Sequence, residues 1–257
     1  MFKAVWNYFE YFGWGVHHEL ADRIEGTLKS HGISRAVALS YPHKKGVAGP
    51  LNRFMADLHA RDTFFIPFAS VYPDDDTFRE DADWALDSPH IFGFKFQPLV
   101  QGFDINHPRL DYVYGQCVER DIPLIIHIGS GPMANEHVGV AHFKALMKRY
   151  PALRVCVPHM GMTEYNDFLV MLDDYPNMYL DTTIINTRTD VCDNTYTGDT
   201  KRLLANADRV CFGTDWPLVP YPYQEALDSV ARFGFTQGQM DGVFYDNAFS
   251  FLRMKAC

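Results

Sequence analysis

The sequence lacks several features that would place it in a common class of protein. Its apolar runs are strand-sized and interrupted by glycine, proline or charge, so no transmembrane helix is predicted. Basic residues number 23 against 32 acidic ones, and the net charge of −9 argues against nucleic acid or an anionic membrane as the main partner. The first strand-to-helix turns contain neither GxGxxG nor a phosphate-loop pattern, so no nucleotide site is predicted there.

Regularly spaced cysteines are also missing. The 5 cysteines are an odd number without CxxC spacing, which indicates neither a disulfide framework nor a thiolate zinc site. We expect reduced, mostly buried thiols. The opening residues, MFKAVWNYFEYFGW, include acidic and aromatic side chains where a signal peptide has a basic end and a plain apolar run. These features favour a cytoplasmic protein.

The sequence does contain a regular succession of short apolar runs, apolar at both parities as in a parallel sheet covered on both faces. Successive starts lie 24 to 32 residues apart, which is the length of one strand and one crossover helix. The chain, residues 1–257, is therefore predicted to form a single α/β domain. The runs begin near Arg35, Phe64, Ile91, Pro123, Arg154, Met178 and Arg209.

These runs are one fewer than the strands of a (β/α)8 barrel. Apolar residues recur at helical spacing over residues 2–9, so the chain opens in a predicted helix with no strand before it. We predict an incomplete TIM-type (β/α)8 barrel whose first strand would lie ahead of Met1, with a doubly wound open sheet as the alternative. The unpaired edges near Arg35 and Arg209 could stay open or be covered by residues near Met1 or by another chain, as in a homodimer.

Polar residues stand at the carboxyl ends of five predicted strands, where the chemistry of an α/β barrel lies. A carboxylate buried there needs a cation, a metal or several hydrogen-bond donors. A single strand-end histidine is more often structural, but two histidines with an aspartate and a lysine at matching positions are harder to explain that way. The five residues are Lys95, His127, His159, Asp181 and Asp215.

His127, His159 and Asp215 form the predicted catalytic or metal-binding set. Imidazole and carboxylate are ligands that zinc and similar divalent ions prefer, and an ion would offset the burial of Asp215. Zinc is the first choice. Trp216, directly after Asp215, and His137, in the loop after His127, are predicted to contact substrate, although loop residues of these types are often structural.

Lys95 is predicted to contact an acidic group of a small-molecule substrate. Phe92, Phe94 and Phe96 alternate with it, so these aromatic side chains would share one strand face and leave Lys95 facing the barrel interior. A structural ion pair with an acid such as Asp181 is the alternative.

Six segments at or near the strand ends carry a further signal: GFKFQPLVQGFD, PLIIHIGSGP, VCVPHMG, YLDTT, FGTDWPLVPY and DNAFSFL. Together they resemble the amidohydrolase superfamily, in the metal-dependent TIM-barrel branch that includes aminocarboxymuconate semialdehyde decarboxylase. The resemblance implies that His127 is a metal ligand and that Asp215 is a ligand or a general base. It implies that His159 is a ligand or an electrophile beside a metal-bound water.

One motif of that superfamily is absent. Members usually begin with a strand ending in HxH, whose histidines bind the metal, and this sequence contains no HxH. His17 and His18 are adjacent and are predicted to be a loop pair. The resemblance implies a metal-dependent hydrolase of a small carboxylated lactone, ester or amide, with nonoxidative decarboxylation on the same site as an alternative. The missing HxH motivates a third hypothesis, a catalytically silent barrel.

Overall fold

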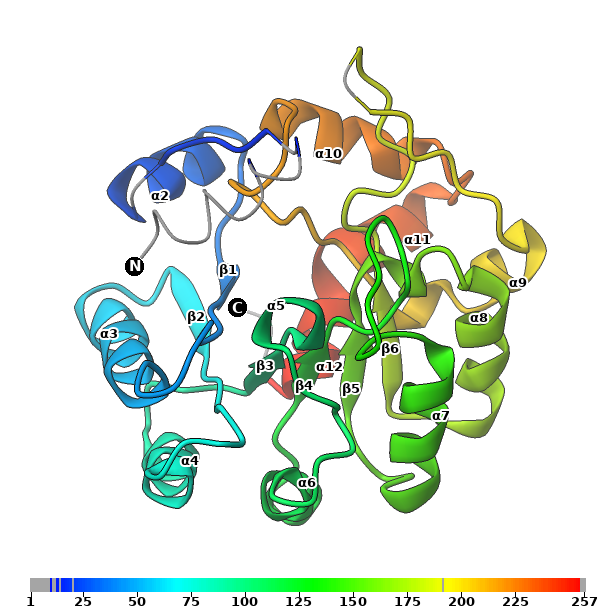
Figure 1. The fold of residues 1–257 in the computed structure, drawn as a ribbon. Helices are drawn as coiled ribbons and strands as arrows, with labels where there is room; N and C mark the ends of the chain where they lie inside the picture. The colour runs from blue at the N-terminus through cyan, green and yellow to red at the C-terminus, as the bar shows by residue number, and fades with distance from the viewer. Residues whose placement is uncertain (1–9, 11–12, 14, 20, 191, 255–257) are drawn as a thin grey trace.

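The computed structural model describes residues 10, 13, 15–19, 21–190 and 192–254. Short strands alternate with helices along the chain, and the helices lie around the outside of the strands (Figure 1). The helix predicted over residues 2–9 falls outside the described residues. The strands are β1 (Ala36–Leu39), β2 (Phe65–Phe68), β3 (Phe94–Phe96), β4 (Leu124–Ile126), β5 (Val155–Val157), β6 (Met178–Asp181) and β7 (Val210–Cys211).

All seven predicted runs contain a strand, although most strands are shorter than the runs. The helices between them confirm the predicted crossovers, and short 3-10 and π segments join the later elements. The α-helices are α2 (Ala21–Ser30), α3 (Ala48–Arg61), α4 (Phe78–Asp87), α5 (Pro98–Gln101), α6 (Leu110–Glu119), α7 (Val140–Arg149), α8 (Tyr165–Asp174), α9 (Thr200–Ala205), α10 (Tyr223–Ala231), α11 (Gln237–Asp241) and α12 (Asn247–Leu252). The other segments are η1 (Pro158–Gly161), η2 (Ala207–Arg209) and η3 (Gly242–Asp246).

The strands are parallel and follow the order of the chain. Pairing forms a two-stranded sheet of β1 and β2 and a five-stranded sheet from β3 to β7. The backbone N–H of Ala69 donates to Gly93 at 2.9 Å and that of Lys95 donates to Ala69 at 2.7 Å, which joins the two sheets at β2 and β3. Sequential parallel strands ringed by their crossover helices make this a TIM-barrel fold, as predicted.

Side chains of the strands alternate between two cores, as period-two strand geometry requires. One set packs outward against the helices and includes Phe94, Phe96, Leu124, Ile126, Val155, Val157, Leu180 and Val210. The other set lies inside the barrel and includes Phe68, Ile125, Cys156, Tyr179 and Cys211, with Phe251 of α12 packed against them. The four described cysteines are free thiols, as predicted, while Cys257 is outside the described residues.

The side-chain alternation confirms one part of the prediction for Lys95 and corrects another. Lys95 pairs in register with Ile125 of the inner set, so it faces the barrel interior. The prediction that Phe92 shares the face of Phe94 and Phe96 is wrong, because Phe92 packs against the inner cluster. Strand β3 begins only at Phe94, so regular alternation does not extend back to Phe92.

Helix α12 closes the end of the barrel opposite the carboxyl ends of the strands. The ring of Phe251 lies in the inner cluster, with its centroid 5.3 Å from that of Tyr179. The buried guanidinium of Arg154 donates to the Phe251 carbonyl and pairs with Asp121 at 2.9 Å. Asp121 and Arg154 precede β4 and β5, so these contacts fix α12 at the amino ends of the strands and leave the carboxyl ends for a site.

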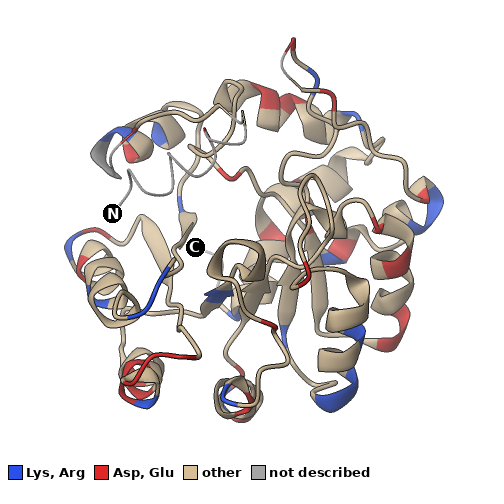
Figure 2. Ribbon diagram, in the orientation of Figure 1, with Lys and Arg blue, Asp and Glu red and all other residues tan. Residues whose placement is uncertain are grey.

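Charge is concentrated away from the barrel interior. Figure 2 shows most of the lysine, arginine, aspartate and glutamate residues on the outer helices and the loops. None of the described helices is long and apolar enough to cross a membrane. The few charged groups inside the barrel therefore stand out from the general pattern.

Candidate active site

His127 directly follows β4 and points into the barrel mouth. Its backbone N–H donates to Phe96 at 3.0 Å, which extends the strand ladder by one residue and keeps the side chain on the inner face. The imidazole is 4% exposed, and neither ring nitrogen has a hydrogen-bond partner in the described part of the chain. Burial lowers the pKa of His127 well below its usual value, and the neighbouring His159 and Lys95 lower it further. His127 is therefore a neutral imidazole with an uncommitted lone pair.

His159 lies in η1, just after β5, in a left-handed backbone conformation with φ 56° and ψ 23°. Its ring nitrogen Nδ1 is 3.2 Å from the carbonyl oxygen of Thr183. Because a carbonyl only accepts, the proton sits on Nδ1 in the neutral ring and Nε2 is left as an acceptor. Nε2 lies 3.6 Å from Oδ2 of Asp215, and the ring centroid lies 5.0 Å from that of His127.

Asp215 follows β7 in a loop, also with a positive φ of 52°. Its side chain is 40% exposed, so it is the member of the predicted set that solvent and small molecules reach most easily. The backbone N–H of Leu218 donates to its carbonyl at 2.6 Å, which closes the loop behind it. The structure thus brings His127, His159 and Asp215 to one mouth of the barrel.

Lys95 contributes a buried amine to the same interior and is 4% exposed. Burial lowers the pKa of Lys95, and the carboxylates of Asp215 and Asp181 oppose that effect at a distance, without a hydrogen bond. Asp181 instead accepts backbone N–H groups from His159 at 2.9 Å and Thr183 at 3.0 Å. Lys95 is therefore left with a donor group facing the interior.

Trp216 and His137, the other predicted substrate contacts, lie in loops around this cluster. The Trp216 ring packs on His17 with centroids 4.1 Å apart, and its buried Nε1 has no partner among the described residues. The backbone N–H of His17 donates to the carbonyl of Pro217, in the loop that follows β7. His17 and His18 lie in neither a helix nor a strand, which confirms the predicted loop pair. The His137 ring lies 3.6 Å from the carboxylate of Glu136, and no hydrogen bond among the described residues draws it into the His127 cluster.

Asp181, Thr183 and Gly213 are structural members of the site that sequence reasoning missed or misread. Asp181 was predicted to be a strand-end polar residue and a possible ion-pair partner of Lys95, whereas it accepts a hydrogen bond from the backbone of His159. A Cβ on Gly213 would lie 2.2 Å from Oγ1 of Thr183 and 3.0 Å from Cγ of Asp181, so only glycine leaves room for this packing. The available signals were the DTT sequence that begins at the last residue of β6 and the glycine two residues before Asp215.

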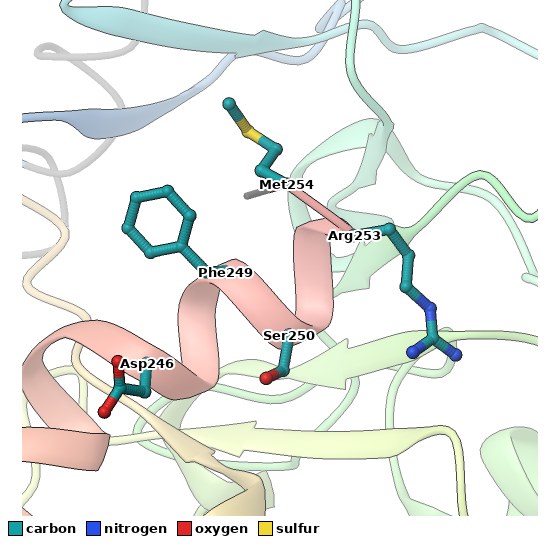
Figure 3. A pocket seen from close by; sticks show the side chains of 5 residues that line it. All are labelled: Asp246, Phe249, Ser250, Arg253 and Met254. Carbon is teal, nitrogen blue, oxygen red and sulfur yellow. The ribbon is translucent and has the colours of Figure 1, made fainter. Parts of the chain in front are cut away.

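A separate open pocket of about 430 Å³ lies on α12, far from this chemistry. Figure 3 shows the side chains that line it, with Phe249 and Met254 projecting to one side of the helix. It sits at the α12 end of the barrel and contains none of the predicted site residues. Its lining residues are Asp246, Phe249, Ser250, Arg253 and Met254.

The donors at the mouth fit a divalent ion in their chemistry. The buried imidazole of His127, which has one lone pair in its neutral form and no partner for either nitrogen among the described residues, the ring of His159 and the carboxylate of Asp215 are ligand types that zinc and similar ions prefer. Nε2 of His159 and Oδ2 of Asp215, 3.6 Å apart, are close enough to contact the same ion. Among the described residues, however, no three His, Cys, Asp or Glu side chains already converge on a single point.

Comparison with known proteins now assigns the family. A family model described as Amidohydrolase matches residues 42–254. This chain belongs to the amidohydrolase family. The amidohydrolase match covers every strand from β2 onward and all the site residues described above, so the cluster at the mouth is part of an enzyme fold. A search of curated proteins found no match.

Solved structures similar to this amidohydrolase are TIM-barrel proteins. An uncharacterised TIM-barrel protein from Bordetella bronchiseptica is 18% identical, with a TM-score of 0.76 over 98% of this chain and 90% of that one. A 2,6-dihydroxybenzoate decarboxylase from Rhizobium is 16% identical, with a TM-score of 0.68 over 91% and 88% of the two chains. A dihydroxybenzoic acid decarboxylase from Polaromonas sp. JS666, solved with bound manganese and 2-nitroresorcinol, is 17% identical, with a TM-score of 0.68 over 93% and 87%. At these identities the likeness shows the fold.

Proposed function

We propose that this amidohydrolase is a metal-dependent decarboxylase of a small carboxylic acid. The observation that carries the proposal is the buried Lys95 amine, which shares the barrel interior with His127, His159 and Asp215 but has no hydrogen-bonded partner of its own among the described residues. A buried cation of this kind suits an anionic substrate. Similar structures include decarboxylases of dihydroxybenzoate and of 5-carboxyvanillate, and two of these were solved with bound manganese.

In this proposal His127, His159 and Asp215 would hold a divalent ion, either manganese or the zinc favoured by the sequence. The ion would supply positive charge that polarises oxygen atoms of the substrate. Burial keeps His127 neutral and therefore able to act as a ligand. His159 offers Nε2 because its other nitrogen is committed to the carbonyl of Thr183.

Side chains of the protein itself would bind the substrate and transfer the proton. The Lys95 ammonium would bind a second acidic group of the substrate and orient the carboxylate toward the mouth. The carbon–carbon bond to the carboxylate breaks, carbon dioxide leaves, and the carbon that keeps the electron pair takes a proton from Asp215. Asp215, whose side chain is 40% exposed, would regain its proton from solvent.

Hydrolysis is the second candidate function, because the matching family model is that of an amidohydrolase. The same residues would serve: Asp215 would take a proton from water as it attacks a carbonyl and later deliver that proton to the leaving group. His159 would stabilise the developing oxyanion, and Lys95 would anchor an acidic group of the ester, lactone or amide.

A substrate panel with two readouts separates these functions. The purified chain is reconstituted with Mn²⁺ or Zn²⁺ and offered hydroxylated aromatic acids and enoic acids, with carbon dioxide measured, and lactones, esters and amides, with released acid measured. Carbon dioxide release that is lost in Asp215→Asn supports the proposal. Release of acid from the esters without carbon dioxide from any acid favours the hydrolase, and no turnover with a bound metal favours the silent barrel.

A further inference from the structure

We infer that Asp181 is a positioning residue that fixes both the backbone and the ring orientation of His159. The effect of Asp181 on catalysis rests on the proposed function. The positioning of His159 does not depend on that function, because it consists of hydrogen bonds within the chain. Asp181 ends β6, is 9% exposed, and stands between the strand ends that carry His159 and Asp215.

One oxygen of the Asp181 carboxylate accepts two backbone hydrogen bonds. Its Oδ1 atom accepts the N–H of His159 at 2.9 Å and that of Thr183 at 3.0 Å, and all three residues are buried. His159 and Met160 both have left-handed backbone conformations, with φ of 56° and 50°, which non-glycine residues rarely adopt without support. Hydrogen bonds to a carboxylate are stronger than those to neutral acceptors, so Asp181 supplies that support.

The second N–H bond gives Asp181 control of the ring as well. Thr183, held at its nitrogen by Asp181, presents its carbonyl to Nδ1 of His159 at 3.2 Å. In the neutral ring that contact holds the proton on Nδ1 and leaves Nε2 facing Oδ2 of Asp215, 3.6 Å away. The carboxylate of Asp181 thereby determines which ring nitrogen of His159 faces the reaction site.

Close packing keeps this arrangement from relaxing. A Cβ on Gly213 would lie 3.0 Å from Cγ of Asp181 and 2.2 Å from Oγ1 of Thr183, so the segment that follows β7 packs directly on the cluster. Burial raises the pKa of Asp181, while its hydrogen bonds and the nearby His159 favour the carboxylate. The ends of β5, β6 and β7 thus form one unit around Asp181.

The chemistry of the contacts separates a positioning role from a simple need for bulk or charge. Asparagine keeps an oxygen that can accept both N–H groups, whereas leucine keeps the volume and offers no acceptor. We expect Asp181→Asn to keep the wild-type tautomer of His159, with the ring proton on Nδ1. We expect Asp181→Leu to shift the tautomer toward Nε2–H and, if the enzyme turns over, to lower kcat about 100-fold through misplacement of the ring.

The test is ¹⁵N NMR of histidine-labelled protein at pH 8, without added metal, with the His159 signals assigned by His159→Gln. Asp174→Leu, at an exposed position on α8, is the control for the substitution itself and should leave the His159 signals unchanged. If Asp181→Leu does not fold, Gly213→Ala provides the second perturbation, because its methyl group displaces Thr183 and should shift the same tautomer.

Wild-type-like His159 signals in folded Asp181→Leu, or in Gly213→Ala where that variant is used, would overturn the inference, as would a wild-type chain that carries the proton on Nε2. The outcome is separable from the proposed function. If the wild type decarboxylates no acid but the variants show the expected tautomer shifts, the proposed function is wrong and the positioning role of Asp181 is retained.

Discussion

Replacing Lys95 with methionine should make the protein more stable and inactive at the same time. The Lys95 amine is 4% exposed inside the barrel, and burial lowers its pKa, so the folded chain carries the cost of a poorly solvated cation. Methionine fills a similar volume without a charge. Replacing buried ionic groups with apolar ones often stabilises by about 1–4 kcal/mol. We expect about 1–2 kcal/mol here, since Asp181 and Asp215 lose a nearby cation.

The pH dependence of this gain has a defined sign. A folded-state pKa below the unfolded value of 10.5 means that the unfolded chain binds more protons, so Lys95 makes wild-type stability rise with pH up to that value. Methionine removes this dependence. The stability difference between Lys95→Met and wild type should therefore be largest near neutral pH and shrink as pH approaches the unfolded pKa.

Urea unfolding of both proteins at pH 7 and pH 9.5, with carbon dioxide release as the activity assay, measures these effects. Lys148→Met, at an exposed position on α7, is the matched control and should change stability by less than about 0.5 kcal/mol. A Lys95→Met protein that is destabilised by more than about 1 kcal/mol and remains active would refute the reasoning. That result is expected if Lys95 forms a structural ion pair and does not bind substrate.

Other substitutions test the site and its frame. His127→Ala should abolish measurable binding of Mn²⁺ in calorimetry while leaving the unfolding free energy nearly unchanged, because the ring has no hydrogen bond to lose among the described residues; tight binding would remove His127 from the ligand set. Asp215→Asn should lower kcat by about 10²–10⁴-fold with wild-type secondary structure, and a loss under tenfold would exclude it as the proton donor. Gly161→Ala should destabilise by about 1–3 kcal/mol in urea, because its Cβ would lie 1.9 Å from the Phe168 ring at a φ of +69°; unchanged stability would mean that α8 moves freely.

The fold could be predicted from the sequence because strand and helix signals recur with a nearly constant spacing. The apolar runs from Arg35 to Arg209 each contain a parallel strand, and the position of Lys95 on the inner face followed from alternation alone. The error at Phe92 has a local cause. Gly93 allows the chain to approach Phe68 and Pro123 closely just before β3, and no sequence pattern marks where regular pleating begins.

The candidate site was predictable in composition but not in geometry. His127, His159 and Asp215 could be named because each follows an apolar strand. The left-handed conformations of His159 and Asp215, and the clamp that Asp181 provides, depend on contacts between residues far apart in the sequence. Trp216 and His137 lie on loops, whose packing is set by neighbours such as His17 and Glu136 rather than by local pattern. The cytoplasmic location and the homodimer stay predictions.

Carbon dioxide release tests the central claim most directly. The purified 257-residue chain, reconstituted with Mn²⁺ or Zn²⁺, is incubated with a panel of hydroxylated aromatic and enoic acids that includes 2,6-dihydroxybenzoate, beside Asp215→Asn as the control. We predict metal-dependent release of carbon dioxide from at least one acid by the wild type and none above background by the variant. Metal-loaded protein that releases no carbon dioxide from any acid, or releases as much after the Asp215 substitution, would contradict the account.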